Sequence, residues 1–227
     1  MPKTTPNEAN PTIYNRLVMS AFYRLWVHWI SHTLAWRVSN RWLRKSYQCW
    51  TGPAHLCIGP GNGHFLRYTS ARTHTVQLLD LNPQCLDMGA KTVRATGKRA
   101  FAHPPQDVAT PWQKVQEESL DSADATMVLH CVRGASLHEK ATVFREAHRV
   151  LKPNGHFFGA TVLSGGPGVA PNLFARLLMR VYNQRTNTFA NTGDRSDDLR
   201  TVLEEAGFVH VWVGVQGTTG VWTAVKR

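Results

Sequence analysis

The stretch that decides the fold is His55-Leu-Cys-Ile-Gly59-Pro-Gly61-Asn-Gly63-His-Phe-Leu66. A short apolar run leads into three glycines at alternate positions, and a segment with helical character follows them. Glycines at such a point let the backbone approach a ligand closely, and the first amide groups of the next helix are free to bind it. This order is typical of a doubly wound sheet, in which ligands bind at the carboxyl ends of the strands.

An acidic residue near the end of the next apolar run strengthens this interpretation. Residues 75–81 have the composition of a second strand, and Asp80 lies near its end, about 20 residues after Gly59. A carboxylate at this position accepts hydrogen bonds from both hydroxyls of a ribose. The glycine loop and Asp80 together predict a nucleoside cofactor.

The rest of the sequence alternates between strand and helix patterns. A strong helix pattern ends at Lys152-Pro-Asn-Gly155, where proline blocks continuation and Asn-Gly favours a left-handed turn. The predicted strands span 55–58, 75–81, 98–102, 123–130, 155–163, 208–215 and 221–226. The predicted helices span 40–50, 64–70, 83–96, 138–151, 172–182 and 197–206, the last with Ser196 as its N-cap. This alternation, with a final antiparallel pair, predicts an α/β fold built on a Rossmann-like, doubly wound sheet of seven strands.

The first 50 residues differ from the rest of the chain in the spacing of apolar residues and in aromatic content. Apolar residues recur at helical spacing from Ile13 to Leu34, and aromatic rings are dense throughout. We expect residues 1–50 to form a helical lid and residues 51–227 to form the core, with a further lid insertion at about 164–192. The aromatic rings either pack the lid onto the core or wall an apolar ligand pocket.

The composition excludes several classes of protein. Of the 227 residues, 42% are hydrophobic and 18% are charged, so the chain can bury a core and is not disordered by composition. The four cysteines show no paired spacing, so we expect neither disulfides nor structural zinc. His28 and His32 have no carboxylate at matching spacing, so no metal site is expected. Without a signal peptide or a membrane span, we expect a cytoplasmic protein.

The glycine spacing points away from dinucleotides, whose sites have the pattern G-x-G-x-x-G. The chain resembles class I S-adenosylmethionine-dependent methyltransferases instead. The motifs that carry this resemblance are the glycine loop, Leu78-Leu-Asp-Leu-Asn-Pro83, Gln106-Asp107, the segment 121–131 and Val150-Leu-Lys-Pro-Asn-Gly155. More narrowly, Leu129-His-Cys131, the segment 158–163, Tyr182-Asn183 and Phe189-Ala-Asn191 resemble small methyltransferases of bacterial and fungal secondary metabolism. The resemblance covers about residues 12–227.

The resemblance implies S-adenosylmethionine as the cofactor and assigns residues to it. The expected cofactor-binding residues are Gly59, Pro60, Gly61, Gly63, Asp80, Leu81, Asp107 and Tyr14. Asp80 would hold the ribose, and Asp107 would meet the adenine amino group. One position departs from the family, because Cys57 stands where an Asp or Glu usually helps to position the methionine ammonium. We expect backbone carbonyls of the glycine turn, with Tyr14, to replace that acid.

For methyl transfer, the main task of the protein is to position the methyl donor and the acceptor. Methyl transfer from a sulfonium is an in-line displacement, and a general base is needed only for a weakly acidic hydroxyl or a protonated amine. His130, after the fourth predicted strand, is the candidate base; the alternative is a histidine that hydrogen-bonds a neighbouring loop. Arg133, Tyr182 and Asn183 are the candidate acceptor-binding residues, and Arg133 also fits a plain surface arginine.

Positive charge gathers outside the predicted core. The chain carries 26 Lys and Arg against 15 Asp and Glu, a net charge of +11. Most of this excess falls in residues 1–50 and 164–192. Such a lid suits an acceptor that is apolar or aromatic with an anionic group, or one presented on an acidic carrier, and a solvated basic face is the alternative.

These features predict methyl transfer to a small, natural-product-like molecule. An RNA methyltransferase is a second hypothesis, motivated by the basic charge. Against it, the fourth-strand motif lacks the Asn/Asp-Pro-Pro-aromatic signature of enzymes that modify exocyclic base amines, so nucleic acid is not the expected partner. A third hypothesis, motivated by Cys57, is a binding protein that kept the fold without catalysis.

Overall fold

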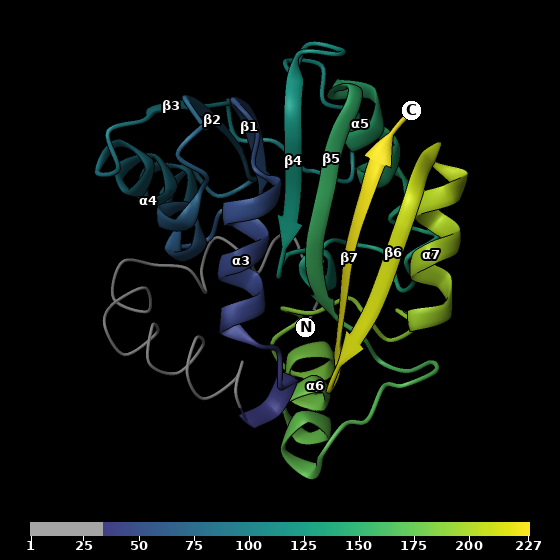
Figure 1. Ribbon diagram of the computed structural model, residues 1–227. Coiled ribbons are helices and arrows are strands. Elements are labelled where there is room, and N and C mark those ends of the chain that lie inside the picture. The colour runs from purple at the N-terminus through teal and green to yellow at the C-terminus, as the bar shows by residue number, and fades with distance from the viewer. Residues whose placement is uncertain (1–33) are drawn as a thin grey trace.

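The computed structural model describes residues 34–227, and Tyr14, His28, His32 and the first part of the predicted lid lie outside them. A single sheet of seven strands has the order β3-β2-β1-β4-β5-β7-β6 (Figure 1). The strands are β1 (Ala54–Ile58), β2 (Thr75–Leu79), β3 (Arg99–Ala102), β4 (Leu120–Thr126), β5 (Leu151–Val162), β6 (Phe208–Gln216) and β7 (Thr219–Lys226). Only β7 runs antiparallel to its neighbours, β5 and β6. The predicted fold class is confirmed.

Helices cover both faces of this sheet. They are α3 (Asn40–Trp50), α4 (Pro83–Arg94), α5 (Ala141–Val150), α6 (Leu173–Gln184) and α7 (Ser196–Glu205), with short 3-10 helices η2 (His64–Tyr68) and η3 (Leu129–Cys131). Figure 1 shows α3 across the front of the sheet and α6 beyond the end towards which β4 and β6 point. No helix in the described part of the chain is long and apolar enough to cross a membrane.

The core has two layers because side chains alternate along each strand. In β1, Leu56 and Ile58 pack in one cluster with the apolar side chains of α5 and α7. Cys57 points the other way and packs with those of α3 and α4. Both faces of the central parallel strands are therefore buried, as a doubly wound fold requires, whereas the edge strand β3 is mostly exposed.

The segment after the glycine loop is shorter than predicted. Instead of a helix over 64–70, it forms the five-residue 3-10 helix η2. The hydroxyl of Thr69 donates back to the carbonyl of Leu66, and the amide of Ser70 donates to Thr51 Oγ1 at 2.7 Å. These contacts end the helix, because they take the polar groups that a further turn would use.

Two other predicted boundaries are wrong for local reasons. The fourth strand ends at Thr126 rather than at residue 130, since Met127 has a φ of +59°, outside the strand region. Ser196 is the first residue of α7 rather than its N-cap. Its hydroxyl donates to the carbonyl of Pro167 at 2.8 Å, and Arg195 takes the N-cap position.

The helix predicted over 138–151 starts three residues late. Successive i→i+3 bonds run from the amides of Lys140 and Ala141 to the carbonyls of Leu137 and His138, so the chain makes a tight turn before α5 begins. The expected left-handed turn after this helix is present, with Asn154 at a φ of +65°. This turn lies within β5, and it shifts the register of the pairing between β4 and β5 at the point between Leu120 and Ser122.

Candidate active site

The glycine loop follows the carboxyl end of β1 and is hydrogen-bonded to the carboxyl end of β2. The amide of Gly59 donates to the carbonyl of Leu79 at 2.8 Å, and the amide of Gly63 donates to that of Pro60 at 2.8 Å. A side chain at Gly59 would overlap Val128, so this glycine is required by packing. A Cβ at Gly61 would meet nothing within 4 Å, and its φ is +53°. The loop is thus closed against the protein at Gly59 and open above Gly61, the side from which a ligand can approach.

Asp80 follows β2 and faces the same edge of the sheet. Its Oδ1 accepts the amide of Asn82 at 2.8 Å, and its carbonyl accepts the amide of Gln106 at 3.0 Å. Burial raises the pKa of Asp80 to about 6, while the amides of Asn82 and Leu81 favour its charged form. A hydroxyl that donated to this carboxylate would favour the charged form further.

Asp107 and Arg133 were predicted for different ligands, yet the structure pairs them. Arg133 Nε lies 3.3 Å from Asp107 Oδ2, and the Arg133 side chain is 56% exposed. Asp107 Oδ1 accepts the amide of Ala109 at 2.9 Å. Gln106, bonded to Asp80, holds this pair beside the ribose candidate. The guanidinium is therefore committed in part to Asp107, at the cofactor side of the edge.

His130 lies on η3 and is buried. Its Nδ1 is 3.4 Å from both Thr161 Oγ1 and the amide nitrogen of Val162, and its carbonyl accepts the amide of Ala190 at 2.8 Å. Its ring packs edge-on against Phe189, with centroids 4.4 Å apart. These contacts match the second sequence interpretation, a histidine that holds a neighbouring loop. A role as general base stays a prediction.

Tyr182 and Asn183 lie on α6 and meet the same loop. Asn183 Nδ2 donates to Asn191 Oδ1 at 2.9 Å, and Asn191 Nδ2 donates to the carbonyl of Val162 at 2.9 Å. The Tyr182 ring packs against Phe189 at 4.8 Å between centroids. The sequence analysis missed Phe189 as a meeting point for rings: it contacts His130 and Tyr182, and Trp36 lies 5.8 Å away. The sequence feature that could have identified Phe189 was its position in Phe189-Ala-Asn191, one of the segments that carry the resemblance described above.

A buried polar network beside Cys57 was also missed. Cys57 of β1 is the register partner of Asp124 of β4. Tyr47 from α3 donates its hydroxyl to Asp124 Oδ2 at 2.7 Å, and His55 Nε2 lies 3.0 Å from Asp124 Oδ1. Burial, and next the Asp124 charge, raise the pKa of both Cys57 and Tyr47 well above the usual range. Polar residues at alternate positions of two buried strands were the signal that could have revealed it.

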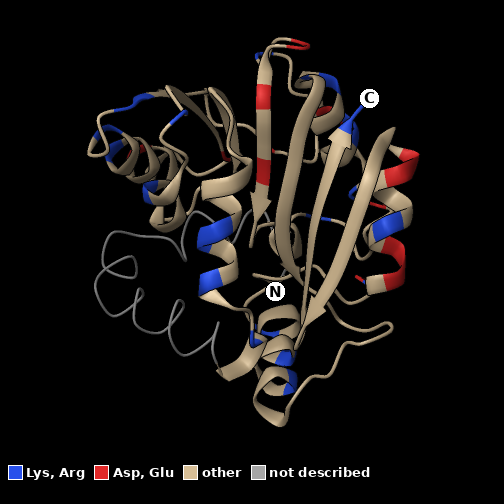
Figure 2. Cartoon of the chain, in the orientation of Figure 1, with Lys and Arg blue, Asp and Glu red and all other residues tan. Residues whose placement is uncertain are grey.

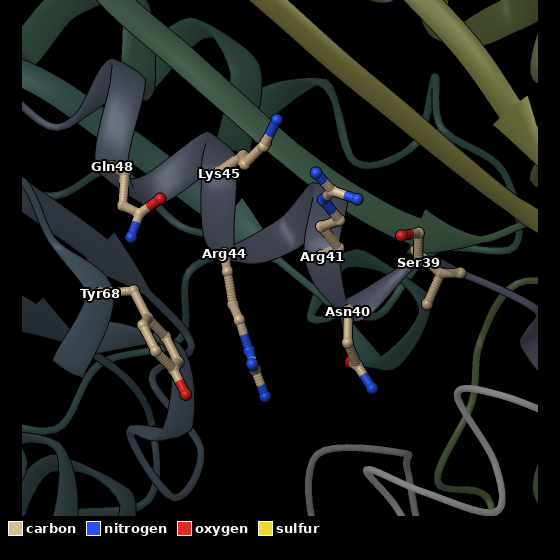
Figure 3. Close-up of a pocket in the computed structure, with 8 residues that line it drawn as sticks. Ser39, Asn40, Arg41, Arg44, Lys45, Gln48 and Tyr68 are labelled. Atoms are coloured by element: carbon tan, nitrogen blue, oxygen red, sulfur yellow. The ribbon is translucent and has the colours of Figure 1, made fainter.

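A basic pocket lies between α3 and η2 (Figure 3). Its volume is about 650 Å³, and the residues that line it are Val38, Ser39, Asn40, Arg41, Arg44, Lys45, Gln48 and Tyr68. The guanidinium carbon of Arg44 lies 4.9 Å from the centre of the Tyr68 ring. Neither α3 nor α6 contains an acidic residue, and Figure 2 colours parts of both helices blue for Lys and Arg and no part red. The three cations of the pocket form no ion pair with any described residue.

Within residues 34–227, no group of three or more His, Cys, Asp or Glu side chains is arranged to hold a metal ion.

Comparisons with known proteins agree with this geometry. The methyltransferase domain family matches residues 56–159, a segment that contains the glycine loop, Asp80, Asp107 and His130. The physcion biosynthesis cluster O-methyltransferase of Aspergillus chevalieri is 34% identical, covering 100% of this chain and 99% of that protein. The chain belongs to the methyltransferase family. It is thus an enzyme of the class I, S-adenosylmethionine-dependent type that its sequence motifs indicated.

Further likenesses extend the comparison. Demethylluteothin O-methyltransferase of Streptomyces thioluteus is 33% identical to this methyltransferase, covering 84% of this chain and 80% of that protein. The crystal structure of the S-adenosylmethionine-dependent methyltransferase SibL, in its apo form, has a TM-score of 0.66 at 21% identity. The match covers 94% of this chain and 62% of that one, and it shows the shared fold.

Proposed function

We propose that this methyltransferase transfers the methyl group of S-adenosylmethionine to a small, natural-product-like acceptor that is apolar or aromatic and carries an anionic group. The observation that carries the proposal is the joint geometry of the glycine loop and Asp80. The loop is open at Gly61, and the carboxylate of Asp80 lies just after the end of the adjoining strand. These features fit a nucleoside whose ribose lies against Asp80.

Each part of the cofactor has a candidate partner along the carboxyl edge. The loop residues Gly59, Pro60, Gly61 and Gly63 would face its chain, Asp80 and Leu81 its ribose, and Asp107 its adenine. When bound, the cofactor supplies a methyl group on a positively charged sulfur, already activated for displacement. The protein then has to align the acceptor and exclude water, and positioning of this kind can lower the barrier by about 7–11 kcal/mol. Where the acceptor is a hydroxyl, His130 would take its proton.

The acceptor side is proposed from the relatives and from charge. Both curated relatives named above are O-methyltransferases by their names, which favours an oxygen acceptor here. Arg133 is paired with Asp107, whereas Arg41, Arg44 and Lys45 face a pocket without carboxylate partners among the described residues. We therefore assign the anionic group to the α3 pocket and keep Tyr182 and Asn183, on α6, as further acceptor-binding candidates. The predicted lid, residues 1–50 with 164–192, would cover the acceptor. An acceptor presented on an acidic carrier uses the same charges.

Binding measurements separate this proposal from its competitors. Calorimetric titration of the full chain with S-adenosylmethionine should show binding with a Kd in the micromolar range, typical of small-molecule sites. Absence of binding would favour a fold kept without catalysis. A gel-shift titration with total RNA at physiological salt should show no specific complex, and a tight complex would favour the RNA hypothesis.

A further inference from the structure

Asp124 is a carboxylate enclosed on all sides beside the glycine loop. Its side chain and that of His55 are 0% exposed. Four groups surround it: the Tyr47 hydroxyl at 2.7 Å, His55 Nε2 at 3.0 Å, the backbone amide of Thr126 at 3.1 Å and the Cys57 thiol. No Lys or Arg of the described chain forms an ion pair with it. The charge state of His55 therefore decides whether this network carries a net charge.

The serine at the far side of the histidine settles that question. Ser122 Oγ accepts the amide of Gly52 at 2.7 Å and lies 2.8 Å from His55 Nδ1. Its hydroxyl proton needs an acceptor, and His55 Nδ1 is the one that the described residues offer. A histidine that accepts at Nδ1 is neutral and donates from Nε2, here to Asp124. The network thus holds one negative charge and no positive one.

A buried carboxylate whose hydrogen-bond donors are all neutral keeps its negative charge, and a nearby cation would stabilise it further. The strand order indicates where that cation would come from. Asp80 follows β2, the glycine loop follows β1, and Asp124 lies on β4, so the three occupy successive positions across the sheet. Cys57, the register partner of Asp124, is two residues before Gly59. A cofactor with its ribose at Asp80 and its chain across the loop brings its amino-acid end towards β4.

We propose that Asp124 supplies the negative charge that holds the methionine ammonium of S-adenosylmethionine, as a positioning residue that acts across Cys57 and Tyr47 without touching the ligand. The inference rests on the proposed function. Charges separated by a buried, weakly polar layer interact more strongly than charges in water, so direct contact is not needed. The neighbouring strand thus provides the charge that Cys57 does not.

The test compares two ligands that both have a neutral sulfur, so that the sulfonium charge does not enter the comparison. S-adenosylhomocysteine carries the amino-acid end with its ammonium, and 5′-methylthioadenosine keeps the nucleoside but lacks that end. In calorimetric titrations, Asp124→Asn should weaken binding of S-adenosylhomocysteine, and of S-adenosylmethionine, about tenfold or more and change methylthioadenosine binding less than about twofold. Equal weakening of both ligands would mean a structural role, and no change in either would also overturn the proposal.

A matched control and an exchange variant complete the test. Asp121→Asn removes a carboxylate of the same strand that pairs with Lys152 instead, and it should leave both affinities unchanged. The exchange Cys57→Asp with Asp124→Cys moves the charge one strand across and should restore S-adenosylmethionine binding; failure to restore it in a folded variant would overturn the proposal. If wild type binds neither ligand, the proposed function fails first.

Nitrogen NMR of His55 in the unmodified protein gives a second readout that does not depend on a variant folding. From the hydrogen bonds we expect a neutral ring with its proton on Nε2. A cationic ring would remove the unpaired charge and overturn the proposal.

Discussion

Lys140 Nζ lies 2.7 Å from Asp194 Oδ2, and both side chains are 0% exposed. The pair joins the start of α5 to the segment that follows the predicted lid insertion. The carbonyl of Asp194 also accepts the amide of Ser164 at 2.8 Å, so both ends of the insertion meet at this point. Burial raises the pKa of Asp194 to about 7 and lowers that of Lys140, and each partner opposes the shift of the other.

The free energy of unfolding should therefore depend on keeping the pair whole. Asp194→Leu leaves a buried ammonium and is expected to cost about 3–5 kcal/mol. The double variant Lys140→Met with Asp194→Leu should recover most of that loss, because no charge is left uncompensated. Urea unfolding of the wild type, both single variants and the double variant checks this. Simple addition of the two single losses would contradict it.

Restoring an acid at Cys57 should destabilise the folded protein. Cys57→Asp would place a second buried carboxylate opposite Asp124. Two adjacent carboxylates cannot both ionise without strong repulsion, so one pKa rises. Cys57→Asp should lower stability more at pH 7 than at pH 5, where a shared proton relieves the repulsion. Cys57→Asn, the uncharged control, should lose the same stability at pH 5 as at pH 7. If Cys57→Asp and Cys57→Asn lost equal stability at each pH, the predicted repulsion would be refuted.

The α3 pocket should act on the charge of the acceptor. Arg44→Gln is expected to raise the KM for a carboxylate-bearing aromatic acceptor about tenfold, because a charge-assisted hydrogen bond contributes roughly 1.5–3 kcal/mol. The KM for the methyl ester of the same acceptor should stay unchanged, as should both values in Arg145→Gln, on α5 away from the pocket residues. Equal effects on acid and ester would show that Arg44 shapes the site without recognising charge.

Cofactor binding should follow the titration of Asp80. Its pKa of about 6 is raised by burial, and ribose hydroxyls that donate to the carboxylate favour the charged form. Binding therefore lowers this pKa, so affinity rises as the pH passes upward through 6 and levels off above about 7. Calorimetry at pH 5 and pH 7 should differ by about tenfold. Asp80→Asn, which cannot ionise, should bind more weakly and lose this dependence; a wild type without it would contradict the assignment.

The sequence was sufficient for the features that rest on local pattern. Glycine spacing, the acid after the second strand and the alternation of elements predicted the sheet, its antiparallel strand and the position of Asp80. Contacts between distant segments were not accessible in this way. The helix after the loop is cut short by Thr51, which lies on the other side of β1 in the sequence.

The site residues divide in the same way. The pairing of Arg133 with Asp107 and the Asp124 network both depend on the register and placement of neighbouring strands and loops. A pattern along one segment does not specify which side chain of the next segment lies opposite. For this reason the sequence pattern identified Cys57 as a departure from the family but did not single out Asp124.

Whether Asp80 binds the ribose of S-adenosylmethionine is decided by titrating this cofactor into wild type, Asp80→Ala and Asp87→Ala. Asp80 loses its ribose contacts in the first variant, and Asp87, on the first turns of α4, serves as a carboxylate control. We expect Asp80→Ala to weaken binding tenfold or more, in line with about 1.5–3 kcal/mol for each charged hydrogen bond, with an unchanged unfolding midpoint. Asp87→Ala should bind like wild type. Unchanged affinity in Asp80→Ala, or no binding to wild type, would contradict the account.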